Sequence, residues 1–92
     1  MDKMLWYVYI LYSASLKRSY VGCAHDVSAR VAKHNSGRVS ATRYGVPWIL
    51  VHSESAGIYA EARRREKYYK TGAGRRKLIA LFDELRRGDR VA

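Results

Sequence analysis

The pattern of apolar and polar residues predicts a strand-rich first half of the chain. Residues 4–12 are apolar, aromatic and β-branched almost throughout, which is typical of a central strand buried on both faces. The polar residues 13–19 then lead to a second short strand over 20–23, so that the two strands form a hairpin. A third strand is expected over residues 48–54, because Pro47 is tolerated at a strand start.

The residues after the hairpin have helical spacing. Asp26 is a favourable N-cap, and residues 27–35 form the predicted helix. Arg30 and His34 are four residues apart and therefore share one face of it. Gly37 is the expected left-handed cap at the end of this helix.

Two further helices are predicted in the second half. Ser55 is expected to cap a helix over residues 57–70, and the glycine-containing residues 71–74 are expected to break it. Residues 75–87 form the clearest amphipathic helix. Its apolar stripe consists of Leu78, Leu81, Phe82 and Leu85. The order β-β-α-β-α-α predicts an α+β domain in which three helices flank a small, three-stranded, mostly antiparallel sheet.

The length and the cysteine content limit the organisation of the chain. With 92 residues, we expect a single domain over residues 1–88 and a short flexible tail over 89–92. Cys23 stands alone, which excludes an intramolecular disulfide and a cysteine-based zinc site and fits a reducing cytoplasm. The apolar run near the N-terminus is too short to span a bilayer. We therefore expect a cytoplasmic protein without a membrane partner.

The charge points to a polyanionic partner. Eighteen Lys and Arg residues against eight Asp and Glu give a net charge of +10, which favours nucleic acid. Basic and aromatic residues are mixed in the polar loop over 38–47, and this mixture suits phosphate contacts and base stacking. The residues expected to contact nucleic acid are Gly22, Arg38, Arg43, Tyr44, Arg63, Lys70 and Lys77.

Five segments in order carry a resemblance to a known family. "YVY" at 7–9 and "YVG" at 20–22 resemble the paired signature of the GIY-YIG nucleases, and "DVSARVAKHNSG" resembles the helix after it. "PWILVHSE" and "EARRREKYYK" resemble the following strand and the helix that bears the family's glutamate. The likeness covers nearly the whole chain. It is greatest to the short stand-alone bacterial branch, which is related to the N-terminal domain of the excision-repair nuclease C subunit.

The resemblance implies a phosphodiesterase that uses one divalent ion, Mg²⁺ or Mn²⁺. By position, Tyr9, Tyr20, Arg30 and His34 correspond to the residues that act at the phosphate, and Glu66 corresponds to the metal ligand. The implied activity is that of an endonuclease on DNA, rather than RNA, in repair or recombination, with a protein partner as one source of specificity.

The residues alone leave several alternatives open. Either Tyr9 or Tyr20 could take the proton, and strand tyrosines are often only packed and hydrogen-bonded. Glu66 could pair on its helix with Arg63 or Lys70. Tyr7 and Tyr12 are interpreted as packing tyrosines. The whole domain could be a non-catalytic nucleic-acid-binding module or an accessory protein of a ribonucleoprotein.

Three positions depart from the family pattern. Tyr7 replaces the first glycine of the signature. Cys23 stands where several relatives have a lysine after the second signature. Many relatives carry an asparagine after the glutamate, whereas this chain has none beyond Asn35. Another basic group is therefore expected at the phosphate.

Overall fold

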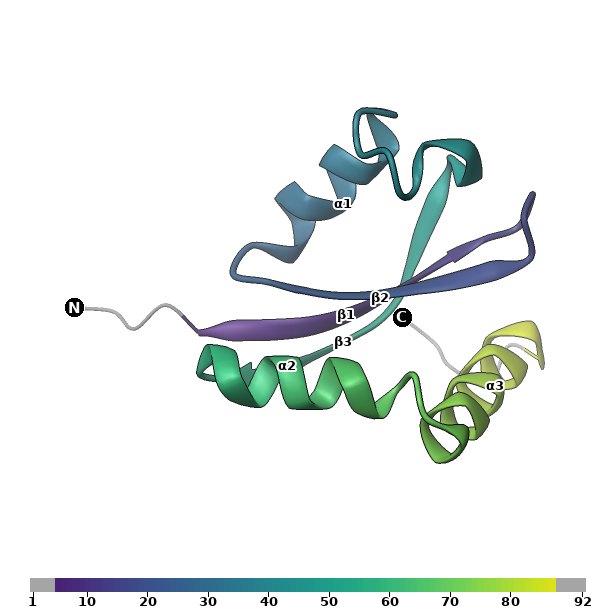
Figure 1. Cartoon of the computed structure of the whole chain (residues 1–92). Coiled ribbons are helices and arrows are strands. Elements are labelled where there is room, and N and C mark those ends of the chain that lie inside the picture. The colour runs from purple at the N-terminus through teal and green to yellow at the C-terminus, as the bar shows by residue number, and fades with distance from the viewer. Residues whose placement is uncertain (1–4, 88–92) are drawn as a thin grey trace.

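A three-stranded antiparallel sheet organises residues 5–87, the part of the chain that the computed structural model describes, with side chains described to residue 84. The strand order is β2-β1-β3, and α1 covers one face while α2 and α3 lie on the other (Figure 1). The elements are β1 (Trp6–Ser13), β2 (Arg18–Ala24), α1 (Val27–Asn35), the short 3₁₀ helix η1 (Arg43–Gly45), β3 (Trp48–Gly57), α2 (Tyr59–Tyr68) and α3 (Gly72–Arg87). The predicted fold class and element order are confirmed.

The central strand β1 contributes to two cores, one on each face of the sheet. Val8 and Ile10 pack on the face covered by α2 and α3, whereas Tyr9 and Leu11 pack on the α1 face. This alternation follows from the period of two along a strand. The prediction that the first strand is buried on both faces is confirmed, and it places the Tyr9 hydroxyl in the interior.

Helix α1 forms as its sequence predicts. The Asp26 side chain accepts a hydrogen bond from the Ala29 N–H at 3.0 Å, which is an N-cap. Gly37 follows the helix with a φ of +81°, a conformation that glycine adopts without strain. The helix therefore has fixed ends, and these determine where Arg30 and His34 lie.

The hairpin and the third strand are longer than predicted. β2 begins at Arg18, so the connecting loop is shorter than the expected 13–19. β3 continues to Gly57, because Ser55 pairs with Tyr7 of β1 and does not cap a helix. Helix α2 instead begins at Tyr59, after the chain turns at Gly57 with a φ of +76°.

A half-buried carboxylate, that of Glu54, fixes α2 against β3. Glu54 accepts hydrogen bonds from Arg65 Nη1 at 2.7 Å and from the Tyr69 hydroxyl at 2.8 Å, and its Oε1 lies 2.7 Å from His52 Nε2. Burial would raise the pKa of Glu54, but the hydrogen bonds from His52 and Tyr69 and the charge of Arg65 lower it. The ionised carboxylate thus holds the helix that carries Glu66.

The start of α3 corrects the expectation that residues 71–74 only break a helix. The Thr71 hydroxyl accepts a hydrogen bond from the Gly74 N–H at 3.1 Å, so Thr71 acts as a cap and α3 begins at Gly72. On the predicted stripe Leu78 is buried, and Leu81 and Phe82 pack against the core. The Leu85 side chain and the predicted tail over 89–92 lie outside the described residues. None of the helices within residues 5–87 has the length and apolar character that crossing a membrane requires.

Substitution by alanine should have different effects on stability at the two glycines near the start of α3. A Cβ at Gly74 would overlap the backbone of Tyr68 and Tyr69, whereas the nearest atom to a Cβ at Gly72 is Arg76 Nη1 at 3.9 Å. We expect Gly74→Ala to lower the free energy of unfolding by at least about 1–3 kcal/mol. Gly72→Ala should be neutral or stabilise by up to about 1 kcal/mol. Urea unfolding measures both values, and equal effects would contradict the packing described for α3.

Candidate nuclease site

A buried chain of three side chains lies on the α1 face. The Tyr9 oxygen is 2.9 Å from His34 Nε2, and His34 Nδ1 is 2.8 Å from Thr42 Oγ1. Tyr9 and Thr42 are 1% exposed and His34 is fully buried. The chain connects β1, α1 and the loop before β3, so three separate segments must be in place for it to form.

The tyrosine in this chain keeps its proton at neutral pH. Burial raises the pKa of Tyr9 to about 12, although the neighbouring Arg30 guanidinium acts in the opposite direction as a hydrogen-bond donor. His34 Nε2, at 2.9 Å, is the hydrogen-bond partner of the Tyr9 hydroxyl among the described residues, and we assign the tyrosine proton to this contact. His34 then carries its own proton on Nδ1 and donates it to Thr42 Oγ1.

His34 is also uncharged at neutral pH, because it is buried and lies near positive charges. Burial lowers the pKa of His34, and the positive charges of Arg30 and Lys33 lower it further. A neutral imidazole can accept at one nitrogen and donate at the other, which is what the two contacts of His34 require. His34 was expected at the phosphate, but the structure places it beneath Tyr9 and away from solvent.

Gly22 makes room for the tyrosines. Gly22, which the sequence placed among the residues expected to contact nucleic acid, lies inside β2, which continues to Ala24 and pairs Gly22 with Tyr9. A Cβ at this position would be 2.6 Å from the Tyr9 hydroxyl and 3.0 Å from Tyr20 Cε1. The absent side chain is therefore a packing requirement of the tyrosine pair.

Tyr20 lies beside this chain but is less enclosed. Its ring centre is 4.9 Å from that of His34, in an edge-on arrangement, and 6.4 Å from that of Tyr9. Tyr20 is half-buried. In the described part of the chain its hydroxyl has no hydrogen-bond partner, so this is the tyrosine whose oxygen is available to a ligand.

Arg30 is the cation of this group. Its positive charge acts to lower the pKa values of Tyr9, His34 and Cys23. Its buried Nε has no hydrogen-bond partner among the described residues. A guanidinium with an unused donor at a half-buried position is suited to an anion.

Glu66 lies on the other side of the sheet, on α2, and it is 8% exposed. Its carboxylate accepts hydrogen bonds from Arg63 Nη1 at 2.9 Å and from Lys70 Nζ at 3.2 Å. Burial would raise the pKa of Glu66, but the hydrogen bonds from Lys70 and Arg63 lower it, so the group is ionised. Both surface pairs that the sequence left open are therefore present.

Cys23 lies between the residues on the α1 face, Tyr9 and Arg30, and Glu66 on the α2 face. Its Sγ is 3.5 Å from Glu66 Oε1, and burial together with the Glu66 charge raises the pKa of the thiol. The same thiol is an electrostatic neighbour of Tyr9 and Arg30. β2 is an edge strand, so this contact lies at the open side of the sheet.

Sequence reasoning missed the residues that hold the loop before β3. Thr42 was assigned only to a polar loop, yet its hydroxyl is hydrogen-bonded to His34 Nδ1, and its carbonyl accepts from Trp48 Nε1 at 2.7 Å. The Asn35 side chain bonds both the N–H and the carbonyl of Trp48, at 2.6 and 3.0 Å. No local signal in the sequence pairs these residues, because the contacts depend on the packed loop.

The other residues expected to contact nucleic acid are spread over the surface. Arg38, Arg43 and Tyr44 are exposed after α1, and Arg43 donates to the Tyr44 hydroxyl at 3.0 Å. Lys77 is exposed on α3 and lines a separate hollow with Glu61. The structure therefore brings Arg63 and Lys70 to Glu66 but leaves Lys77 apart from this group.

The neutral histidine predicts a pH dependence of stability. The pKa of His34 is lower in the folded state than its ordinary value of 6.5, so the unfolded chain binds the proton first as the pH falls. The free energy of unfolding should therefore decrease as the pH is lowered through about 6.5. Urea unfolding between about pH 7.5 and 5 measures this free energy. The His34→Gln substitution should remove its decrease at low pH.

A second histidine provides the control for that experiment. His25 lies outside the buried chain, with its Nδ1 3.0 Å from the Leu5 carbonyl oxygen. His25→Gln should retain the decrease that His34 causes. If His34→Gln and the unsubstituted protein lose stability equally over this range, His34 is not the responsible group.

Comparisons with known proteins identify the family of this chain. A family model described as the GIY-YIG catalytic domain matches residues 5–78. A UPF0213 protein of Staphylococcus epidermidis is 39% identical over 79 residues, which cover 85% of this chain and 93% of that protein. A UPF0213 protein of Staphylococcus saprophyticus is 35% identical over 84 residues, covering 90% and 99%. No solved structure matches the chain significantly. The chain belongs to the GIY-YIG family, in its short stand-alone UPF0213 branch.

Proposed function

We propose that the protein is a metal-dependent endonuclease that hydrolyses phosphodiester bonds in DNA. The observation that supports this most strongly is the set of polar side chains on the α1 face. There the hydrogen-bonded Tyr9–His34–Thr42 chain supports Tyr20 and Arg30, whose polar atoms retain unused hydrogen-bonding capacity. A buried donor without a partner, such as the Arg30 Nε, is uncommon in a protein interior and supports a site whose hydrogen bonds are completed by a ligand.

In this proposal the two tyrosines have different roles. Tyr9 is buried and protonated, because its pKa is about 12, so it orients its neighbours and does not touch the substrate. Tyr20 has the accessible hydroxyl, and it contacts the attacking water or a phosphate oxygen. Arg30 binds the phosphate through its planar fork of donors. The base of the reaction is thus assigned to Tyr20 rather than to Tyr9.

The donor set at Glu66 fits Mg²⁺ or Mn²⁺. The described residues contain no cluster of three His, Cys, Asp or Glu side chains that could hold a metal ion. A hard divalent ion that keeps most of its waters needs only one ionised carboxylate from the protein, and Glu66 is ionised. Such an ion supplies charge neutralisation at the phosphorus. Glu66 would hold the ion, and Arg63 and Lys70, which pair with Glu66 in this structure, would be close enough to contact the phosphate backbone.

A non-catalytic nucleic-acid-binding module is the alternative. It is favoured by the two ion pairs of Glu66, which satisfy the carboxylate without a metal ion. It is also favoured by Cys23, an uncharged residue in contact with Glu66 where several relatives have a lysine. Under this alternative the basic surface and the fold remain, and Glu66 only fixes the end of α2.

The proposal places the activity in the cytoplasm, in repair or recombination, with DNA preferred to RNA. A domain of this size has little surface for reading base edges, so substrate shape or a protein partner would supply specificity. The excess of positive charge would supply salt-dependent affinity that is independent of sequence.

Cleavage assays on paired variants test the proposal. Single-stranded, duplex and branched DNA, and RNA of the same sequences, are incubated with Mg²⁺, Mn²⁺ or EDTA. We expect cleavage of DNA that needs the divalent ion and is lost in Glu66→Gln. Tyr20→Phe should reduce the rate by about 10²–10⁴-fold, the usual contribution of a general acid or base.

Matched controls separate this result from a change in charge or folding. Glu61→Gln removes an exposed carboxylate from the same helix, and Tyr68→Phe removes an exposed hydroxyl. Both controls should cut as the unsubstituted protein does. If no substrate is cut above the Glu66→Gln background while DNA binding persists, the binding module replaces the enzyme as the assigned function.

A further inference from the structure

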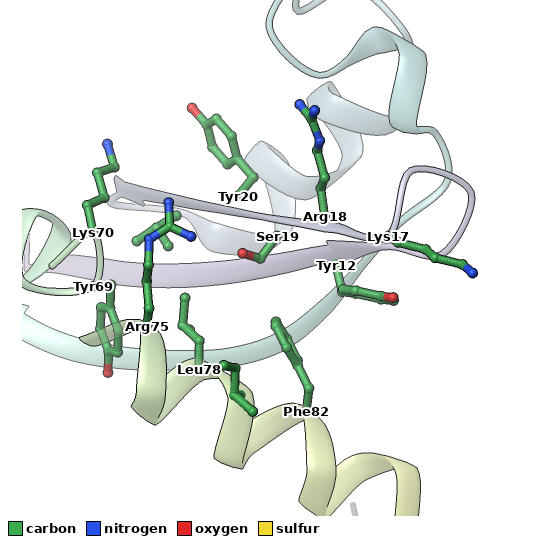
Figure 2. Close-up of a pocket in the computed structure, with 12 residues that line it drawn as sticks. Tyr12, Lys17, Arg18, Ser19, Tyr20, Tyr69, Lys70, Arg75, Leu78 and Phe82 are labelled. Atoms are coloured by element: carbon green, nitrogen blue, oxygen red, sulfur yellow. The ribbon is translucent and has the colours of Figure 1, made fainter. Parts of the chain in front are cut away.

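A hollow of about 630 Å³ lies along the β1–β2 hairpin and the first half of α3. Figure 2 shows it between the edge of β2 and the helix, with side chains from the hairpin on one side and from α3 on the other. Pockets of this size hold small organic groups. It lies outside the group formed by Tyr9, His34 and Thr42, and the proposed reaction makes no use of most of its residues.

The hollow is continuous with the proposed site through two residues. Tyr20 lines it at the edge of β2, and Lys70, which donates to Glu66, lines it at the end of α2. A chain molecule that reaches Tyr20 and Glu66 therefore has a direct path into the hollow. This continuity identifies the occupant as a neighbouring part of the same ligand.

Among the described residues, the charged side chains that line the hollow are all cations. They are Lys17, Arg18, Lys70 and Arg75 (Figure 2). In the described part of the chain, Lys17, Arg18 and Arg75 form no ion pair, so their charge is not neutralised locally. Cations spaced along a groove are suited to successive phosphates of a nucleic-acid backbone.

The floor of the hollow is apolar and aromatic. Tyr12 and Phe82 lie with their ring centres 5.1 Å apart, and Leu78 and Ile79 of α3 adjoin them. Ile79 is 59% exposed, which leaves an apolar surface in contact with solvent. Tyr12, interpreted from the sequence as a packing residue, therefore also presents a face to the hollow. A nucleobase released from its stack would cover this surface.

We propose that this hollow is a nucleotide subsite, which binds one unpaired base on its Tyr12–Phe82 floor and the adjoining phosphates with Arg18 and Arg75. The substrate class that follows is a single-stranded segment of nucleic acid next to the scissile phosphate, because a base in a duplex cannot turn out without unpairing. The subsite rests on the proposed function for its position relative to the cleaved bond, but its occupancy can be measured without cleavage.

A binding experiment with a modified ligand tests the base-binding floor. Glu66→Gln protein without divalent ions is titrated with fluorescein-labelled oligothymidylate, and with the same oligomer carrying one abasic spacer at each position in turn. We expect the spacer to weaken binding by about 5- to 100-fold at one or two positions only. Duplex of the same length should bind more weakly than the single strand. An abasic spacer without effect at any position overturns the proposal.

Protein variants assign that effect to the hollow. Tyr12→Leu keeps an apolar side chain and should abolish the difference between the intact and the abasic oligomer, as expected for two groups in contact. Arg75→Ala should reduce the slope of log affinity against log salt by about 1, whereas Arg76→Ala, its neighbour outside the hollow, should not. Circular dichroism checks that each variant is folded. A Tyr12→Leu variant that is folded and retains the full abasic effect contradicts the assignment.

The binding and cleavage experiments test the subsite and the nuclease activity independently. Base-dependent binding with no cleavage by the unsubstituted protein supports the subsite and removes the nuclease assignment. Cleavage without base-dependent binding supports the nuclease and removes the subsite.

Discussion

The positions of α1 and of the loop before β3 depend on the free-energy cost of burying the Tyr9 hydroxyl on the central strand. A buried hydroxyl without a partner costs about 1–3 kcal/mol, and His34 Nε2 provides that partner at 2.9 Å. His34 in turn needs Thr42, and Thr42 is held by Trp48. One hydrogen-bonding requirement on β1 therefore determines the position of α1 and of the loop before β3. Gly22 meets the same requirement from the other side, since only a residue without Cβ leaves room for the ring.

The edge strand β2 brings residues next to the buried Tyr9–His34–Thr42 side chains to the protein surface. Side chains along a strand alternate between faces, so Tyr20 and Gly22 lie on the α1 face and Cys23 lies on the α2 face. At this open edge Cys23 contacts Glu66, which is paired with Arg63 and Lys70. The hollow with Arg18 and Arg75 continues along the same edge. A phosphodiester chain lying along β2 would meet the tyrosine, the carboxylate and the cations in succession.

Features that depend only on local residue type and spacing could be predicted from the sequence. The N-cap at Asp26, the left-handed Gly37 and the two-sided burial of β1 follow from residue type and spacing, and all three are present. The element boundaries that failed depend on tertiary contacts: Ser55 looks like a cap but pairs with Tyr7, and Gly74 looks like a breaker but allows a close approach of helix ends. Within the candidate site, the spacing of Arg30 and His34 predicted their shared helix face, and the family resemblance implied their roles. Thr42 was not predicted, because its partner His34 is contributed by a separate element, α1.

The protonation state of His34 tests the central claim most directly. Long-range ¹H–¹⁵N NMR of the labelled protein distinguishes the two neutral tautomers and the charged imidazolium. The Tyr9–His34–Thr42 chain requires a neutral ring at neutral pH, with its proton on Nδ1 and with Nε2 unprotonated, because the buried Tyr9 donates to Nε2. A spectrum of the Nδ1–H tautomer supports the account. A proton on Nε2, or a charged ring at neutral pH, would contradict it.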